Sequence, residues 1–205
     1  MVTDKKYNWP SFLSLVIILQ ISCHPNCYLG KYNLVKGSAL FYPQTDSLHV
    51  GDTLWMNIKI PITLKSAVDS SLVNISGASG MATDVLVTIL AKPNTSIGAL
   101  DSFSRVSQTG SFAINNSAPD ASLVIQFTEQ AGSFVFTLGW IPLKSGIYAI
   151  IPHDIFRGEK KCFTASIQIQ VENADQHLHY LRDIYYDGNP IALIDSLHNY
   201  CFKVY

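Results

Sequence analysis

Alternation of apolar and polar residues is the feature that most limits how this chain can fold. Residues 52–60 place apolar side chains at every second position, namely Leu54, Met56, Ile58 and Ile60. Residues 163–172 repeat the pattern with Phe163, Ala165, Ile167, Ile169 and Val171. Because successive side chains of a strand point to opposite faces, each segment predicts a strand with one buried face.

Further segments predict strands by the same test, and clusters of Gly, Pro, Asn and Ser separate them. They cover residues 84–91, 122–128, 133–140, 146–151 and 200–205. Many short strands joined by turn residues are typical of a β-sandwich or barrel and not of β-α-β units. The 133–140 segment aligns four large side chains on one face, which predicts an aromatic contribution to the core: Phe134, Phe136, Leu138 and Trp140.

One short helix is predicted near the C-terminus, over residues 174–183. Asn173 precedes it as a possible N-cap, and the Asp-Gly-Asn-Pro sequence at 187–190 follows it. Side chains of Asn cap helix N-termini well, and Gly and Pro end helices. We therefore predict an all-β chain with a single helical segment.

The N-terminus has the organisation of a cleaved signal peptide. Lys5 and Lys6 precede an uncharged apolar run at residues 12–21, and Ser22 and Cys23 follow. The run is about half the roughly 20 residues that a spanning helix needs. Residues 19–23 resemble a bacterial lipobox, although Gln20 departs from the tighter pattern. This predicts cleavage before Cys23 and lipid on that cysteine; the alternative is an ordinary signal peptide with Cys23 in a disulfide.

This interpretation divides the chain into three parts. Residues 1–22 form the signal peptide, residues 23–37 form a tether, and residues 38–205 form one β-sandwich domain. A domain of that length buries a core without disulfide staples.

A disulfide between Cys162 and Cys201 is compatible with the predicted strands. Each cysteine has the parity of polar neighbours, so both are expected on the outer face of their strands. A bridge between them requires neighbouring strands with Cα atoms within about 7 Å. The alternative is two free thiols on strands that do not adjoin.

Charge and motifs argue against nucleic-acid binding and against catalysis. The chain has 14 Lys and Arg and 15 Asp and Glu, and its net charge is −1. That balance offers no basic surface to neutralise phosphates, so no nucleic-acid partner is expected. No nucleophile elbow, zinc-protease motif or phosphate-binding glycine loop is present, so we expect no enzyme activity and no cofactor.

A histidine pair near the predicted helix is the strongest candidate for a metal site. His177 and His179 are two positions apart, with His198 further on. On a helix, positions i and i+2 point to different faces, and zinc needs three or four converging ligands. We therefore expect solvent-facing histidines and no metal.

Three exposed aromatic residues are the candidates for ligand binding. Trp55 has the parity of Thr53, Asn57 and Lys59, so it lies on the polar face of its strand, where an aromatic ring can stack on a sugar or an apolar patch. Tyr185 and Tyr186 precede a turn and could form a loop contact. In the alternative interpretation, the helix or tether covers Trp55, and the tyrosines pack a loop onto the sheet.

Residues 41–55, Phe-Tyr-Pro-Gln-Thr-Asp-Ser-Leu-His-Val-Gly-Asp-Thr-Leu-Trp, resemble the start of the mature domain in uncharacterised Bacteroidetes lipoproteins. The resemblance implies an Ig-like antiparallel β-sandwich in the cell envelope and carries no activity. Surface-exported lipoproteins of that phylum usually have acidic residues soon after the lipidated cysteine, whereas residues 24–42 contain none. We therefore expect an outer-membrane lipoprotein that faces the periplasm.

These observations predict a membrane-anchored envelope lipoprotein that binds an envelope protein or glycan without catalysis. Two alternatives remain open: a hydrolase acting on envelope glycan, and a structural spacer.

Overall fold

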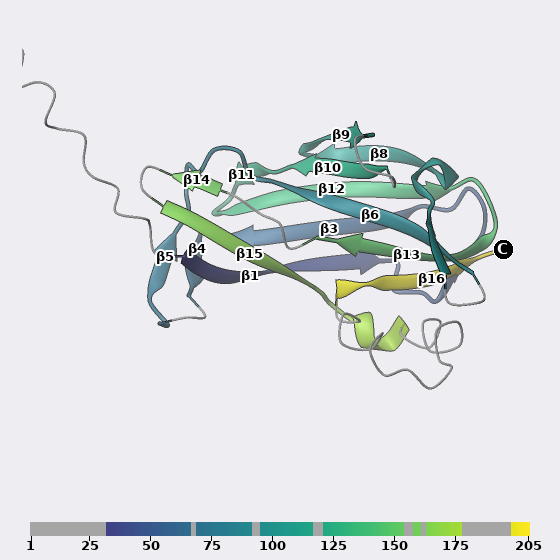
Figure 1. Cartoon of the computed structure of the whole chain (residues 1–205), viewed down its shortest axis with the longest axis horizontal. Helices are drawn as coiled ribbons and strands as arrows, with labels where there is room; N and C mark the ends of the chain where they lie inside the picture. Colours follow the sequence, from purple (N-terminus) through teal and green to yellow (C-terminus); the bar gives the residue numbers. More distant parts are fainter. Residues whose placement is uncertain are drawn as a thin grey trace, which may run out of the picture.

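Two β-sheets face each other across one core (Figure 1). The computed structural model describes residues 32–66, 69–91, 95–116, 121–153, 158–160, 163–177 and 198–205. Sheet A has the order β11-β12-β3-β1-β15-β14, and β8 also pairs with β12. Its strands are β1 (Tyr32–Tyr42), β3 (Leu54–Pro61), β8 (Phe103–Thr109), β11 (Thr128–Gln130), β12 (Ser133–Pro142), β14 (Gly158–Lys160) and β15 (Phe163–Val171).

Sheet B forms the second layer. Its order is β2-β16-β13-β6-β10-β9, and β7 also pairs with β6. Its strands are β2 (Ser47–Leu48), β6 (Ala82–Ala91), β7 (Thr95–Gly98), β9 (Ser111–Asn115), β10 (Ser122–Gln126), β13 (Gly146–Pro152) and β16 (Tyr200–Val204). A separate hairpin joins β4 (Thr63–Lys65) to β5 (Leu72–Asn74), and two 3₁₀ turns lie outside the sheets, η1 (Leu100–Ser102) and η2 (Ala174–His177).

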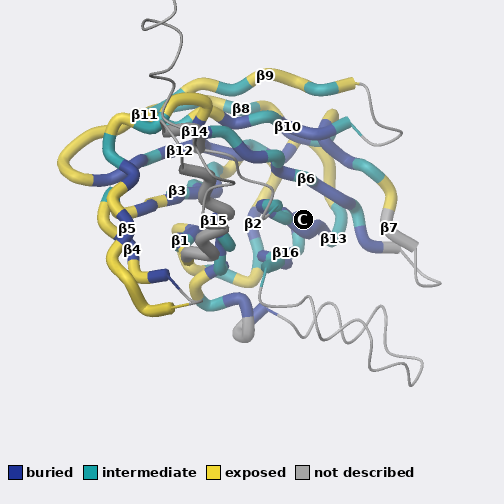
Figure 2. The backbone as a smooth tube through the Cα atoms, turned by 60° about the vertical axis from the view of Figure 1, so that its left-hand side comes forward, coloured by how far each residue is buried: buried dark blue, intermediate teal, exposed yellow. Residues whose placement is uncertain are grey.

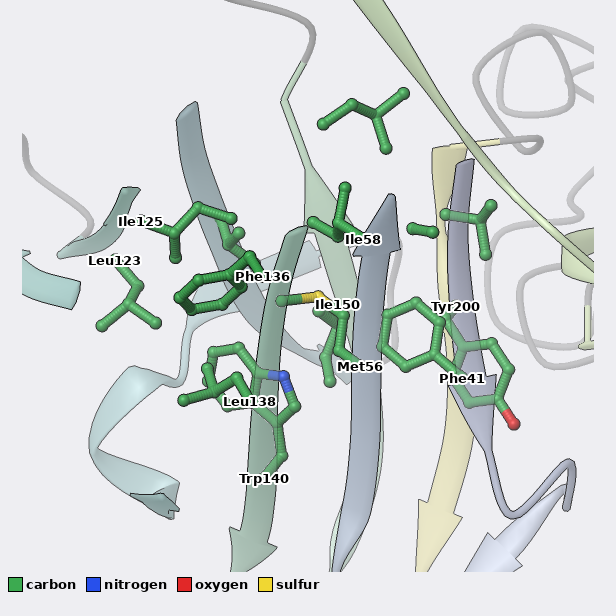
Figure 3. Packing of buried hydrophobic residues seen from close by; sticks show 14 of the residues in the cluster. Phe41, Met56, Ile58, Leu123, Ile125, Phe136, Leu138, Trp140, Ile150 and Tyr200 are labelled. Atoms are coloured by element: carbon green, nitrogen blue, oxygen red, sulfur yellow. The ribbon is translucent and has the colours of Figure 1, made fainter. Parts of the chain in front are cut away.

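Large aromatic side chains from both sheets fill the space between the layers (Figure 3). Phe41 of sheet A stacks on Tyr200 of sheet B, with ring centroids 4.3 Å apart. Phe103 meets Trp140 and Tyr148 edge-on, at centroid distances of 6.0 and 4.8 Å. Edge-to-face and offset-stacked pairs are the arrangements that the ring quadrupoles favour. These contacts hold the two sheets together by favourable ring geometry as well as by burial of apolar surface.

The predicted alternation is confirmed along the central strands. In β3 the apolar set is fully buried, whereas Trp55 is half-buried and Lys59 is exposed. The aromatic face predicted for residues 133–140 is buried in β12, together with Ile167, Ile169 and Val171 of β15. Figure 2 shows the inner strands largely buried and the edge strand β9 largely exposed. The chain is therefore a β-sandwich, as predicted.

The chain passes directly from sheet A to sheet B between β8 and β9. Gly110 separates the two strands and has a φ of +79°. A Cβ atom there would lie 2.5 Å from the carbonyl oxygen of Gln126 and 2.6 Å from the Phe136 ring. Only glycine fits both the left-handed backbone and the close approach, so this residue makes the corner of the sandwich possible.

Two predictions about strands were wrong in detail. The sheets are not purely antiparallel, because β1 pairs in parallel with β15, and β16 pairs in parallel with β2. The predicted tether is also too long, because β1 begins at Tyr32. Mixed residues at 32–37 hid the strand, whose backbone bonds to neighbours on both sides and whose Gly37 is buried.

The predicted helix begins as a single 3₁₀ turn, η2, and residues 178–183 lie outside the described residues. Asn173 does not have the extended backbone of an N-cap, since its φ is +63°. Asn tolerates the left-handed region because its short polar side chain can hydrogen-bond locally. The residue therefore ends β15 with a turn where the sequence predicted a cap.

Candidate binding face

Trp55 lies on the outward side of sheet A, beside a second aromatic ring. Strand register pairs Trp55 with Tyr42 of β1. The two rings stack with centroids 6.3 Å apart and planes 17° from parallel. Tyr42 is 37% exposed and Trp55 is half-buried, so the pair is accessible to a ligand. Strand β1 places Tyr42 at the side of Trp55, and most of the helix and tether that the alternative interpretation places over Trp55 lies outside the described residues.

A glycine beneath Trp55 fixes the position of its ring. Gly139 of β12 pairs with Trp55 on one side and with Val106 of β8 on the other. A Cβ atom on Gly139 would lie 2.9 Å from Thr53 and Val106 side-chain carbons and 3.1 Å from Cζ3 of Trp55. The absence of a side chain therefore leaves the space that the indole occupies.

Small and polar side chains make up the centre of the same outward surface. Asn57 Nδ2 donates a hydrogen bond to Thr137 Oγ1 at 2.8 Å. On the other side of Asn57, strand register places Leu40 of β1, which is half-buried. We call this outward surface the open face of sheet A, defined by Lys36, Ser38, Leu40, Tyr42, Trp55, Asn57, Lys59, Val106, Thr137, Gln170 and Glu172.

The end of the open face opposite the aromatic pair is hollowed into a groove of about 450 Å³. Its floor is at Ser38, which pairs with Lys59 on β3 and with Gln170 on β15. Lys36 lies at one end of the groove, and Glu172, which is exposed, lies at the other. The lining residues are Lys36, Gly37, Ser38, Lys59, Pro61, Gln170, Val171 and Glu172.

Cys201 is a free, fully buried thiol, so the predicted disulfide with Cys162 is not formed in the structure. Parity was predicted correctly, because Cys201 points away from the core-facing Tyr200 and Phe202. However, β16 belongs to sheet B and β15 to sheet A, so the strands do not adjoin. Cys201 instead packs with Leu90 and Ala149, and burial raises the pKa of its thiol to about 12. Cys162 lies outside the described residues.

His177 is buried, and the prediction of a solvent-facing side chain was wrong. Its Nδ1 lies 3.0 Å from Oδ1 of Asp46, and its ring packs on Tyr200 at 4.3 Å. Tyr200 Oη donates a hydrogen bond to the Thr45 carbonyl, and burial raises the pKa of Tyr200 to about 12. His177 therefore connects η2 to the segment before β2. Among the described residues, no three His, Cys, Asp or Glu side chains converge as metal ligands do.

The remaining predicted sites fall on residues that the structure does not describe: Cys23, Tyr185 and Tyr186. Within the described ranges, no helix is both long enough and apolar enough to cross a bilayer. Sequence reasoning found Trp55 but missed Tyr42, Gly139 and the groove. The missing signal was β1: once residues 32–42 are assigned to a strand, their parity places Lys36, Ser38 and Tyr42 on one face.

Comparisons with known proteins add little to this description. No family model matches the chain, and no curated protein matches it significantly. Among solved structures, a non-cellulosomal cohesin from the hyperthermophilic archaeon Archaeoglobus fulgidus matches with 8% identity and a TM-score of 0.30, covering 83% of this chain and 91% of that chain. The resemblance of residues 41–55 to Bacteroidetes lipoproteins stays a prediction.

Proposed function

We propose that this protein is a non-enzymatic binding module, held at an envelope membrane by lipid on Cys23, which binds another envelope macromolecule through the open face of sheet A. The Tyr42–Trp55 ring pair on an accessible sheet surface carries this proposal. Aromatic residues that remain exposed on a rigid sheet supply contact area with little loss of side-chain entropy on binding. The core does not need them, because it is filled by other rings.

Position along β1 supports a ligand that approaches from the side away from the anchor. Residues 24–31 separate Cys23 from the start of β1 and span at most about 30 Å when fully extended. Strand β1 then runs through Lys36 to Tyr42, so the groove is nearer to the anchored end and the aromatic pair is further from it. The aromatic pair is therefore the part of the open face that lies further from the proposed anchor.

Chemistry of the groove favours binding over hydrolysis. Glycosidases of the common type use two carboxylates on either side of the scissile bond. The groove is lined by one carboxylate, Glu172, together with two lysines. A hydrolase would show release of new reducing ends from envelope glycan, and we expect none.

The anchor is tested by mass spectrometry and membrane fractionation of the native protein. We expect a diacylglyceryl mass on Cys23 and loss of membrane association in Cys23→Ala. A wild-type protein that carries no lipid and stays soluble would remove the anchor from the proposal.

The binding face is tested by comparing three forms of the protein on immobilised envelope glycan and on solubilised envelope protein. Trp55→Ala should lose most retention of the ligand, whereas Tyr205→Ala should retain it. Tyr205 is a matched control because it is 58% exposed and lies outside the open face. Equal retention by wild type and Trp55→Ala would refute the proposed face.

A further inference from the structure

We propose that the ligand of the open face is an anionic glycan, with its acidic group held between Lys36 and Lys59 and a neighbouring sugar ring stacked on the Tyr42–Trp55 pair. The inference rests on the proposed function, because it names the ligand class of the same face. Two observations support the inference: the charge of the groove, and the distance between the groove and the aromatic rings.

Two lysines point into the groove region from neighbouring strands. Ser38 pairs with Lys59, so Lys36, two positions away on β1, is the diagonal neighbour of Lys59. Diagonal cross-strand neighbours lie about 7–8 Å apart at their α-carbons, which is within reach of long side chains. Both side chains can therefore contact one anionic group placed over Ser38.

Neither lysine is neutralised within the part of the chain that the structure describes. Both line the groove and are exposed, and no ion pair to either is found among the described residues. Glu172 supplies one negative charge against their two. Like charges on neighbouring strands repel, and a concave site of one sign concentrates the opposite ion. Since the whole chain has a net charge of −1, this attraction is local to the groove.

The aromatic pair lies at a distance that requires an elongated ligand. Lys59 and Trp55 are on the same face of β3, four positions apart, which corresponds to about 13 Å along the strand. A ligand that contacts both must be longer than one sugar ring. Asn57 lies between them with Leu40 beside it, and Ser38 lies beside Lys59, so Asn57 and Ser38 are hydrogen-bonding partners for sugar hydroxyl groups and Leu40 is an apolar contact.

Shape favours a glycan over an acidic polypeptide. Protein interfaces gain most of their affinity from side chains inserted in desolvated pockets. The described groove is instead an open surface hollow lined by Ser38, Gln170 and charged side chains together with Gly37, Pro61 and Val171, and two nearly parallel aromatic rings lie at the other end of the same face. A sugar ring offers a flat C–H surface to such rings and hydroxyl groups to the rest of the face.

Binding should be measured on the full lipidated protein in detergent by calorimetry, with oligosaccharides of matched length. Oligogalacturonate supplies carboxylates, sulfated dextran oligosaccharide supplies sulfates, cello-oligosaccharide is the neutral comparison, and polyglutamate supplies charge without sugar. We expect one or both anionic glycans to bind about tenfold more tightly than the neutral one. The carboxylated and sulfated probes distinguish which acidic group the lysines hold.

Variants separate the charge from the aromatic pair. Lys36→Gln and Lys59→Gln should each weaken the binding of the anionic glycan about three- to fivefold and make that binding less dependent on salt. Neither substitution should change the affinity for the neutral glycan. Trp55→Ala should weaken the binding of both the anionic and the neutral glycan. Lys144→Gln is the control, because Lys144 is exposed in the β12–β13 turn away from the groove.

The outcomes separate this inference from the proposed function. If neutral and anionic glycans bind equally and Trp55→Ala loses that binding, the inference that the ligand carries an acidic group would be wrong, and the proposed binding face would stand. Lysine-dependent binding of polyglutamate as tight as that of the glycans would replace the glycan with an acidic polypeptide. Failure of every anionic glycan to bind would overturn the inference, and indifference of every binding ligand to Trp55→Ala would overturn the proposed function as well.

Discussion

The outward surfaces of the two sheets differ in chemistry although both belong to the same sandwich. On sheet A most outward side chains are charged, polar or aromatic, with the aliphatic Leu40 and Val106 among them, and Lys36, Tyr42, Lys59 and Val106 are exposed. On sheet B the outward surface of the three strands β6, β13 and β16 carries an apolar cluster in which Leu90, Ala149 and Cys201 are buried, beside polar residues such as Thr88 and Lys203. An apolar surface that is already buried contributes to stability, whereas an exposed aromatic surface is available to a ligand. Under the proposed function, the outward face of sheet B contributes to stability and that of sheet A to ligand binding.

Introducing a charged residue on the outward face of each sheet should test whether the two faces differ in their contribution to stability. Ala149→Asp would bury an unpaired carboxylate at a position that is 1% exposed. We expect the free energy of unfolding to fall by about 3–5 kcal/mol, measured by urea denaturation. Val106→Asp, at a position 43% exposed on the open face, should change it by less than about 0.5 kcal/mol. Should the two substitutions cost the same, the division would be wrong; Ala149→Ser gives the same ordering at lower cost if Ala149→Asp does not fold.

Filling the space at Gly139 should disturb the open face without exposing the core. The side chain of Gly139→Val would collide with Thr53, Val106 and the Trp55 ring. We expect a loss of about 1–3 kcal/mol in stability, together with weaker ligand binding, because the indole must move. Gly132→Val, at a position with no atom within 4 Å of an added Cβ, tests the cost of replacing glycine alone, although its φ of +76° adds strain. A Gly139→Val protein with unchanged near-ultraviolet circular dichroism and binding would show that Trp55 is not seated there.

Alkaline titration should report the burial of Cys201. The thiol is neutral in the folded protein because burial raises its pKa to about 12, while the unfolded thiol has a pKa near 9. Above pH 9 the unfolded state therefore binds fewer protons than the folded state, and stability falls as pH rises toward 12. Between pH 8 and pH 10 we expect this group to account for about 1 kcal/mol. Tyr200 adds to the loss, so the Cys201 contribution is the difference in slope between wild type and Cys201→Ala; equal slopes would mean an accessible thiol.

An effect similar in size to that of Cys201 is expected from the polar pair at the centre of the open face. Thr137→Val removes the acceptor for Asn57 Nδ2 and preserves the shape of the side chain. We expect a loss of about 1 kcal/mol, since Asn57 is half-buried and can still reach water. The double-mutant cycle with Asn57→Ala measures the coupling, and a coupling of zero would show that the hydrogen bond does not contribute.

The strands with clean alternation could be predicted from sequence because one face of each meets a continuous core. Residues 52–60 and 133–140 are such segments, and both strands lie where the pattern places them. Strand β1 was missed because Gly37 and Ser38 weaken its hydrophobic pattern. Without that strand, the sequence could not predict that Tyr42 lies beside Trp55 or that a groove forms on the same face. Pairing partners cannot be obtained from parity: Cys201 has the outward parity predicted, yet its strand lies in the other sheet from β15. Burial of an outward side chain depends on what lies above it, which alternation does not encode.

Strand β1 also determines how the domain would bear mechanical load. It is hydrogen-bonded along its length, in parallel to β15 and antiparallel to β3. With the proposed anchor on Cys23 and the proposed ligand on the open face, a pull between the two would act along the axis of β1. Force in that direction shears the ladder to β15 along residues 32–39 and the ladder to β3 along residues 38–42, because the inter-strand bonds lie across the direction of pull. The two ladders therefore join the N-terminal side of the domain to the open face, and extraction of β1 would break bonds to both neighbours.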